Sequence, residues 1–202
     1  MFEALSSRKF LVIRLVILLL ALVLAVWASP AEETLGNSVK IVYVHGSIVQ
    51  VGELLIILSG VLGLIYFLGK SESVIRWSAA FQKVGFLFLL VSLFVSLYAA
   101  SQIWGSINFG EPRLQALIRI LVAGTASIAM IMLFPKPAVI AWSGIVMVAF
   151  SVFNVVTAVL VVHPDNAIGS SNSFAIKFYY GLMLVLFFVL AMEIARLIRP
   201  AK

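Results

Sequence analysis

Six stretches of about twenty mostly apolar residues constrain this chain more than any other feature of its sequence. They run near residues 10–28, 46–68, 84–103, 114–134, 138–162 and 178–198. An α-helix rises about 1.5 Å per residue, so each stretch is long enough to cross a hydrocarbon core about 30 Å thick. The sequence therefore predicts an all-α, polytopic membrane protein, built as a bundle of six transmembrane helices.

The composition agrees with a chain dissolved in lipid. Of the 202 residues, 63% are hydrophobic and 11% are charged, whereas soluble domains average about 45–50% and about 25%. No polar stretch is long enough to form a soluble domain, so residues 1–202 are expected to form one transmembrane domain. The chain has no cysteine, which excludes thiolate metal sites, disulfides and thiol redox chemistry.

Lysines and arginines in the loops predict how the chain is oriented. With the N-terminus inside, only four of the 14 fall on the outer side, namely Lys40, Arg113, Arg119 and Lys177. Because cytoplasmic loops carry an excess of these residues, we expect both termini in the cytoplasm and a multi-pass protein of the cell (cytoplasmic) membrane. The net charge of +6 then follows from topology, and no nucleic-acid partner is expected.

The first apolar segment has a second interpretation. A charged start, an apolar run and residues 28–31 (Ala-Ser-Pro-Ala) are also typical of a cleaved signal peptide. Arg14 would interrupt such a run, and in a retained helix it is expected to extend to the inner headgroups. Cleavage would leave five helices with unchanged orientation.

The inner connections and the spans carry further signals. On the inner side we expect an amphipathic link over 70–83 and a tight turn at 135–137. Glu193 and Arg196 are three residues apart and predict a local ion pair. Small residues around 59–63 predict close helix packing. Asn154 and Thr157 are expected to form hydrogen bonds between helices.

Two histidines, His45 and His163, are the only ones in the chain, and both fall at outer ends of predicted helices. His45 precedes the second helix, and His163 ends the fifth. Neutral imidazole is a natural axial ligand of haem iron, and two imidazoles at one depth could hold one porphyrin between them. The alternative is that both are ordinary residues of the headgroup boundary, because chance alone puts two histidines on one side half of the time.

Two arginines stand at the outer end of the fourth predicted helix. Arg119 lies about 9 Å further along the helix than Arg113, below the headgroups, where an arginine usually has a partner. One interpretation is a structural ion pair with Glu53, which lies about two turns into the second helix. The other is an anionic ligand, such as the propionates of haem. Both hold if Glu53 and Arg119 line one cavity.

Three outer segments contain motifs that occur together in one family. The first is Tyr43-Val44-His45, a Tyr-x-His at the outer start of a helix. The second is the loop 104–114, which begins Trp-Gly and ends Arg-Leu at the spacing of W-G-x-x-W-x-W-D-x-R-L. The third is His163-Pro164. In this order and on one side, they resemble the haem-handling cytochrome c assembly family of the CcmC/CcsA type.

The loop also departs from the pattern of that family. Ile107, Asn108 and Gly110 occupy positions where the family has aromatics or Trp-Asp, and Glu111 replaces the aspartate. The family uses this loop as a platform for the porphyrin. The aromatic surface expected here is therefore smaller.

The resemblance implies a haem-binding protein of cytochrome c maturation. A b-type, non-covalent haem, bound stably or in transit, would sit at the extracytoplasmic face between His45 and His163. Trp104 and Tyr43 would contact it, and Arg113 with Arg119 would meet its propionates. The implied partners are an extracytoplasmic haem acceptor or chaperone and ABC-type cytochrome c maturation subunits.

Other functions stay open. The same histidines would serve an electron-transfer membrane subunit with a bis-histidine haem b. A third possibility is a small transporter or structural subunit without haem, in which Glu53 and Arg119 are the substrate or packing groups. The sequence contains no paired carboxylates, Ser-His-Asp grouping or nucleotide-binding loop that stands out, so the chain is not expected to be an enzyme.

Overall fold

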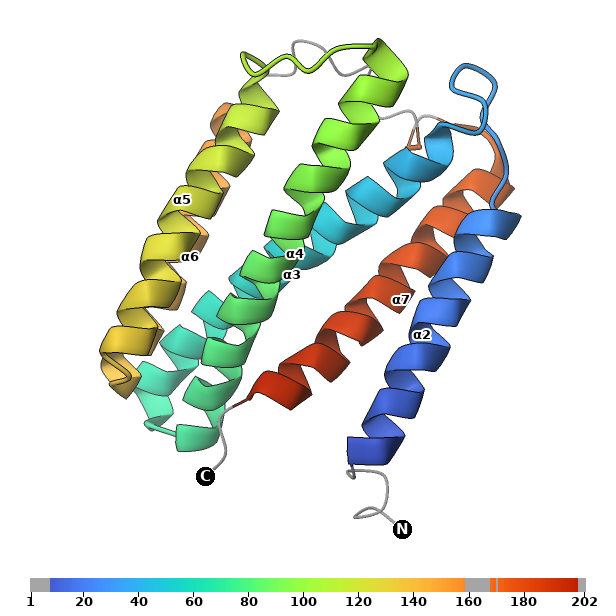
Figure 1. The fold of residues 1–202 in the computed structure, drawn as a ribbon. Helices are drawn as coiled ribbons and strands as arrows, with labels where there is room; N and C mark the ends of the chain where they lie inside the picture. Colours follow the sequence, from blue (N-terminus) through green and yellow to red (C-terminus); the bar gives the residue numbers. More distant parts are fainter. Residues whose placement is uncertain (1–7, 159–167, 170, 200–202) are drawn as a thin grey trace.

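The structure is a computed structural model and describes residues 8–158, 168–169 and 171–199. This part of the chain forms six α-helices and no β-strand (Figure 1). The helices are α2 (Arg8–Ala28), α3 (Val39–Gly69), α4 (Glu72–Trp104), α5 (Pro112–Leu133), α6 (Pro137–Thr157) and α7 (Phe174–Ile198). All six are long and apolar enough to cross a membrane, which confirms the predicted fold class and the number of spans.

Two helices begin well before their predicted starts. α3 begins at Val39, so His45 lies in its second turn and does not precede the helix. The segment 70–83 is not a link, because α4 begins at Glu72. Its apolar side chains pack inward, as at Ile75, which is fully buried. In an amphipathic stretch of this kind, the apolar face packs on the protein core and the polar face points outward.

The outer end of α6 also differs from the prediction. The helix ends at Thr157, and Ala158 already has an extended backbone, so the described helix is shorter than 138–162. Asn154 Nδ2 donates to the carbonyl O of Phe150, and Thr157 Oγ1 donates to that of Phe153. The prediction that these two side chains join helices is wrong, because carbonyls four residues earlier in the same helix accept their hydrogen bonds.

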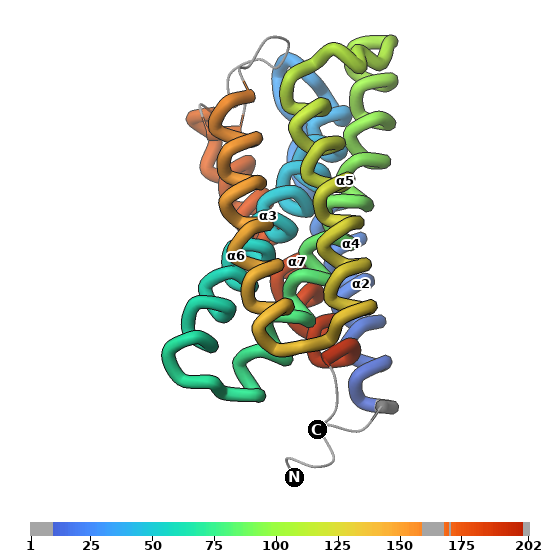
Figure 2. Tube along the Cα trace, turned by 90° about the vertical axis from the view of Figure 1, so that its left-hand side faces the viewer, coloured from blue at the N-terminus to red at the C-terminus, as the bar shows by residue number. Residues whose placement is uncertain are grey.

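Helix α3 organises the bundle, because it contacts α2, α4, α6 and α7 (Figures 1 and 2). α5 packs on α4 and α6, whereas α2 packs mainly on α7. α2 begins and α7 ends at the same end of the bundle (Figure 1). Following the predicted orientation, we call this the inner end and the opposite one the outer end.

Glycines bring α3 very close to its neighbours. A Cβ on Gly85 of α4 would lie 3.0 Å from the carbonyl O of Gly52. On the inner side, a Cβ on Gly63 would lie 2.7 Å from the carbonyl O of Ala141 in α6. Lipid provides no hydrophobic drive for helix association, so close backbone approach of this kind is a main source of packing energy. The predicted close packing around residues 59–63 is confirmed.

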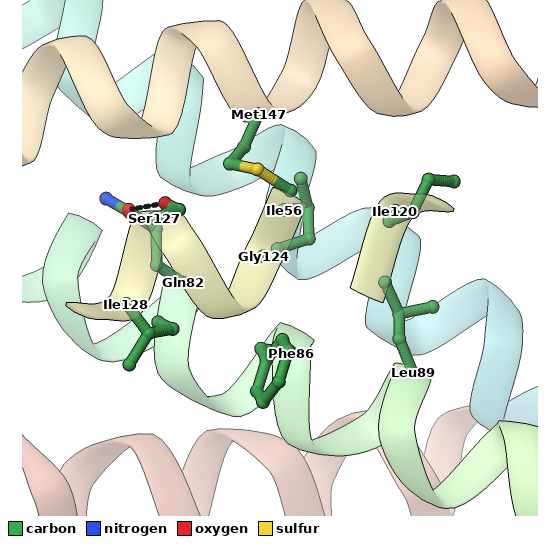
Figure 3. Close-up of a pocket in the computed structure, with 9 residues that line it drawn as sticks. All are labelled: Ile56, Gln82, Phe86, Leu89, Ile120, Gly124, Ser127, Ile128 and Met147. Carbon is green, nitrogen blue, oxygen red and sulfur yellow. Dashed lines mark hydrogen bonds between the residues drawn. The ribbon is translucent and has the colours of Figure 1, made fainter. Parts of the chain in front are cut away.

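A network of neutral polar side chains joins the helices in the inner half of the bundle. At its centre is Gln82 of α4, which is only 1% exposed. Gln82 Nε2 donates to the carbonyl O of Ile140 in α6 at 3.0 Å, and Oε1 accepts from Ser143 Oγ at 3.0 Å. Ser127 of α5 reaches the same Oε1 at 3.5 Å (Figure 3).

The network extends to α3 and borders a small cavity. Gln82 Nε2 reaches Ser78 Oγ at 3.4 Å, and Ser78 Oγ donates to the carbonyl O of Ser59 at 2.9 Å. The cavity beside Gln82 and Ser127 measures about 10 Å³, and apolar side chains form its other walls (Figure 3). This volume holds at most one water, so the network serves to join helices.

An ion-pair group fastens α2 to α7 near the inner end. Glu193 of α7 is 5% exposed and accepts from the guanidinium groups of both Arg14 and Arg196. The pair with Arg196 confirms the predicted local pair. Arg14 Nη2 lies 3.0 Å from Glu193 Oε2, so the charge within α2 meets a carboxylate of another helix. The first apolar segment therefore packs as part of the bundle.

We expect Gln82→Ala to lower the free energy of unfolding by about 2 kcal/mol, because interhelical hydrogen bonds in membranes contribute about 0.6 kcal/mol each and a cavity is added. Unfolding in mixed micelles by sodium dodecyl sulfate measures the loss. Gln102→Ala is the matched control, since Gln102 is exposed on the same helix. Equal losses in the two variants would contradict a stabilising role for the network.

Candidate functional site

Three of the predicted site residues lie at the outer end of the bundle. His45 lies near the start of α3, Trp104 ends α4, and Arg113 is the second residue of α5. These helix ends lie at the same end of the molecule (Figure 1). His163 lies outside the described residues. The site must therefore be built from the side chains of α3, α4 and α5.

His45 lies on the side of α3 that faces the helices α4 to α6. Residues seven and eleven positions later, Gly52 and Ile56, fall on the same row of the helix, because seven residues make nearly two turns. A Cβ on Gly52 would lie 3.0 Å from the Leu89 side chain of α4, and Ile56 packs in a cluster with residues of α4, α5 and α6. The imidazole is half-buried. It thus lies at the outer edge of a packed helix interface.

Tyr43, two residues earlier, faces a different group of helices. It is 0% exposed and packs with Ala25 of α2 and Met183 of α7. Its hydroxyl donates to the carbonyl O of Pro30 at 3.4 Å, and its ring centroid lies 6.4 Å from that of Tyr180. This side chain joins α2, α3 and α7 and offers no exposed surface to a ligand.

The loop between α2 and α3 is held by Glu32. Its carboxylate accepts hydrogen bonds from the N–H groups of Thr34 and Leu35 and from Thr34 Oγ1. These bonds lower the pKa of Glu32, and the bond from Leu35 has the largest effect. Because Pro30 of this loop contacts Tyr43, an ordered loop helps to fix the outer end of α3.

The loop between α4 and α5 is shaped by a capping carboxylate. α4 ends at Trp104, and its C-cap is Gly105, whose φ of +68° suits glycine. α5 begins at Pro112, and Glu111 is its N-cap. The Glu111 side chain is buried and accepts from the N–H of Leu114. Aspartate, which the resemblance led us to expect near this position, serves the same capping role. An acidic residue before proline is the sequence signal for this cap.

Exposed apolar side chains follow along this loop. Trp104 is 40% exposed, and Ile107 and Phe109 are also exposed. A hydrogen bond fixes the backbone at Phe109, because its carbonyl O accepts from Gln115 Nε2 at 3.2 Å. The loop therefore presents a small aromatic surface, although the family's central tryptophans are missing.

The two arginines of α5 lie on different sides of the helix. Arg113 shares a row with Ile120, which is buried. Both arginines are exposed, and none of the ion pairs among the described residues joins either of them to Glu53. Six residues turn a helix by about 600°, so the two guanidiniums point about 120° apart.

The described residues contain no group of three or more histidine, cysteine or acidic side chains that could hold a metal. A scan against models of protein families finds no match for this chain, and a search of curated proteins finds no significant match. The resemblance to the cytochrome c assembly family therefore rests on the motifs alone.

We expect the α2–α3 loop to loosen in acid. Because the pKa of Glu32 is lowered in the folded loop, ionisation stabilises the loop above the ordinary value of about 4.5, and this contribution is lost as the pH falls through the lowered pKa. Glu32→Gln should speed hydrogen exchange of the loop amides at neutral pH. Glu33→Gln is the control, and equal exchange in the two variants would refute the assignment.

Proposed function

We propose that this protein binds haem at the outer end of its bundle and hands it to an extracytoplasmic acceptor during cytochrome c maturation. The observation that carries the proposal is the position of His45. It is a half-buried imidazole in the second turn of α3, at the end of the bundle where Trp104 and Arg113 also lie.

The residues at this end suit a porphyrin. Bound haem supplies an iron with two axial positions and two propionate carboxylates. His45 is the proposed first axial ligand, and the exposed side chains of Trp104 and Phe109 would cover an apolar edge. Arg113, which is exposed in the first turn of α5, is the proposed partner of a propionate. Charge-assisted hydrogen bonds between guanidinium and carboxylate are strong and directional.

His163 is the proposed second axial ligand. It lies outside the described residues, so its support comes from the sequence, which has no other histidine besides His45. α6 ends at Thr157 and α7 begins at Phe174, both at the outer end (Figure 1).

The place of His45 favours a protein that releases its ligand. Electron-transfer subunits commonly hold haem deep in a bundle, whereas His45 is one turn from the start of α3. An acceptor could therefore approach the ligand from the aqueous side. In this proposal the outer end faces the extracytoplasmic space, as the lysine and arginine distribution predicts. ABC-type subunits would supply the nucleotide chemistry.

A haem-free small transporter is the second candidate. It rests on Glu53, a carboxyl within the span of α3, and on Arg113 in the first turn of α5, because ionisable groups in membrane spans are commonly functional. In that case these two groups would bind the substrate, and the histidines would be dispensable.

We expect purified wild-type protein to bind hemin with a Soret band, and His45→Ala to lose most of it. Added imidazole should restore the band, because it replaces the missing axial ligand. Gln50→Ala, an exposed position on the same helix, is the control. Transfer of the bound hemin to apomyoglobin separates a chaperone from an electron-transfer subunit, which would retain it. Wild-type protein that takes up no hemin would refute the proposal.

The two arginines provide a matched test of the proposed propionate contact. Arg113→Ala should weaken hemin binding about tenfold, since a hydrogen bond to a charged group contributes about 1.5–3 kcal/mol. Arg119→Ala should change the affinity little, because this side chain points away from the site. Hemin titrations followed by absorbance measure both. A larger loss with Arg119→Ala would contradict the orientation of the bound haem.

A further inference from the structure

An apolar groove runs along the outside of the bundle between α3 and α6, which lie side by side in Figure 2. It has a volume of about 240 Å³. Every residue that lines it is apolar: Ile57, Gly60, Val61, Leu64, Ile145, Val148 and Ala149. Several of these side chains are exposed at the surface. The groove lies within the spans of both helices, so it opens toward lipid.

Aromatic rings close the inner end of the groove. Phe67 follows the groove residues of α3, and its ring centroid lies 5.2 Å from that of Trp142 in α6. The distance along α3 from Ile57 to Phe67 is about 15 Å, because the helix rises about 1.5 Å per residue. One leaflet of a hydrocarbon core about 30 Å thick has the same depth. The groove itself runs along α3 from Ile57 to Leu64, about 10 Å, and together with the rings at its end it spans the depth of the acyl region of the inner leaflet.

Positive charges lie just beyond these rings. Lys70 Nζ sits 4.8 Å from the ring centroid of Phe67 and 5.2 Å from that of Tyr66. Lys136 is the N-cap of α6, about 9 Å beyond Trp142 toward the same end. The positive end of the dipole of α6 points there as well.

Negative charge is scarce around this end of the groove. The stretches 54–69 of α3 and 137–157 of α6 contain no aspartate or glutamate. The nearest carboxylate along the chain is that of Glu72, which is exposed at the start of α4. The combination is an apolar groove with a cationic end at the membrane surface.

We propose that this groove binds an anionic glycerophospholipid of the inner leaflet, with an acyl chain between α3 and α6 and the phosphate at Lys70 and Lys136. A partner helix fits less well, because helices associate in lipid through small residues. The small residues Gly60 and Gly63 of α3 already pack against α6. A Cβ on Gly60 would lie 2.5 Å from Val148, and one on Gly63 would meet Ala141.

Trp142 can report on the lipid, because it is 59% exposed and stands at the end of the groove. The triple variant Trp27→Phe, Trp77→Phe, Trp104→Phe leaves it as the only tryptophan. The protein is reconstituted into vesicles with increasing fractions of bromine-labelled phosphatidylglycerol or bromine-labelled phosphatidylcholine. Phosphatidylglycerol should quench Trp142 fluorescence at lower mole fractions.

Substitutions separate the headgroup from the acyl chain. Lys70→Gln and Lys136→Gln should each reduce the preference for phosphatidylglycerol about fivefold, whereas Lys40→Gln at the outer end should not. Ala149→Phe should fill the groove and reduce quenching by both lipids. Ala126→Phe, on the exposed side of α5, is the matched control.

Two results would overturn the proposal. The first is that the two lipids quench Trp142 fluorescence equally and that the lysine substitutions do not change this quenching. The second is occupation by another copy of the chain. The chain has no cysteine, so Val61→Cys introduces a single thiol in the groove. Disulfide-linked dimers of this variant in the bilayer, together with little quenching by either lipid, would identify a helix as the occupant.

Discussion

Close contact of α3 with α4 and α6 is the constraint on which the rest of the structure depends. Glycines at positions 52, 85 and 63 let backbones approach until a single Cβ would meet a carbonyl oxygen at about 3 Å. Such contacts fix the rotation of α3 about its axis. The rotation in turn sets the sides of α3 on which His45 and Glu53 lie. The proposed haem site is therefore positioned by packing near the middle of the membrane.

The lipid environment explains why polar side chains are matched across helices. A buried amide or carboxylate in hydrocarbon has no water to bond, so its partners must come from the protein. Gln82 meets groups of three other helices, counting those reached through Ser78. Glu193 meets two arginines, one of them on α2. The neutral network holds the central helices, and the charged group holds α2, whose packing is otherwise almost confined to α7.

Apolar length and local spacing could be predicted from the sequence, because both follow from residues close together in the chain. The six helices and the pair between Glu193 and Arg196 are of this kind. Arg14 finds Glu193 across 179 residues, which no local pattern reveals. Asn154 and Thr157 donate to carbonyls of their own helix, so a polar side chain in a span does not by itself reveal a bond between helices. Helical phase alone could have separated Arg113 from Arg119, whereas the burial of Tyr43 depends on where α7 packs.

The central claim, that haem is held by the histidine side chains of this chain, can be tested on the iron itself. The chain has only two histidines, so growth with ¹⁵N-histidine labels the two proposed ligands and nothing else. Electron–nuclear double resonance of the ferric protein should then show ¹⁵N coupling from imidazole, and His45→Ala should remove part of it. Ferric haem bound to the labelled protein without any ¹⁵N coupling would contradict the claim.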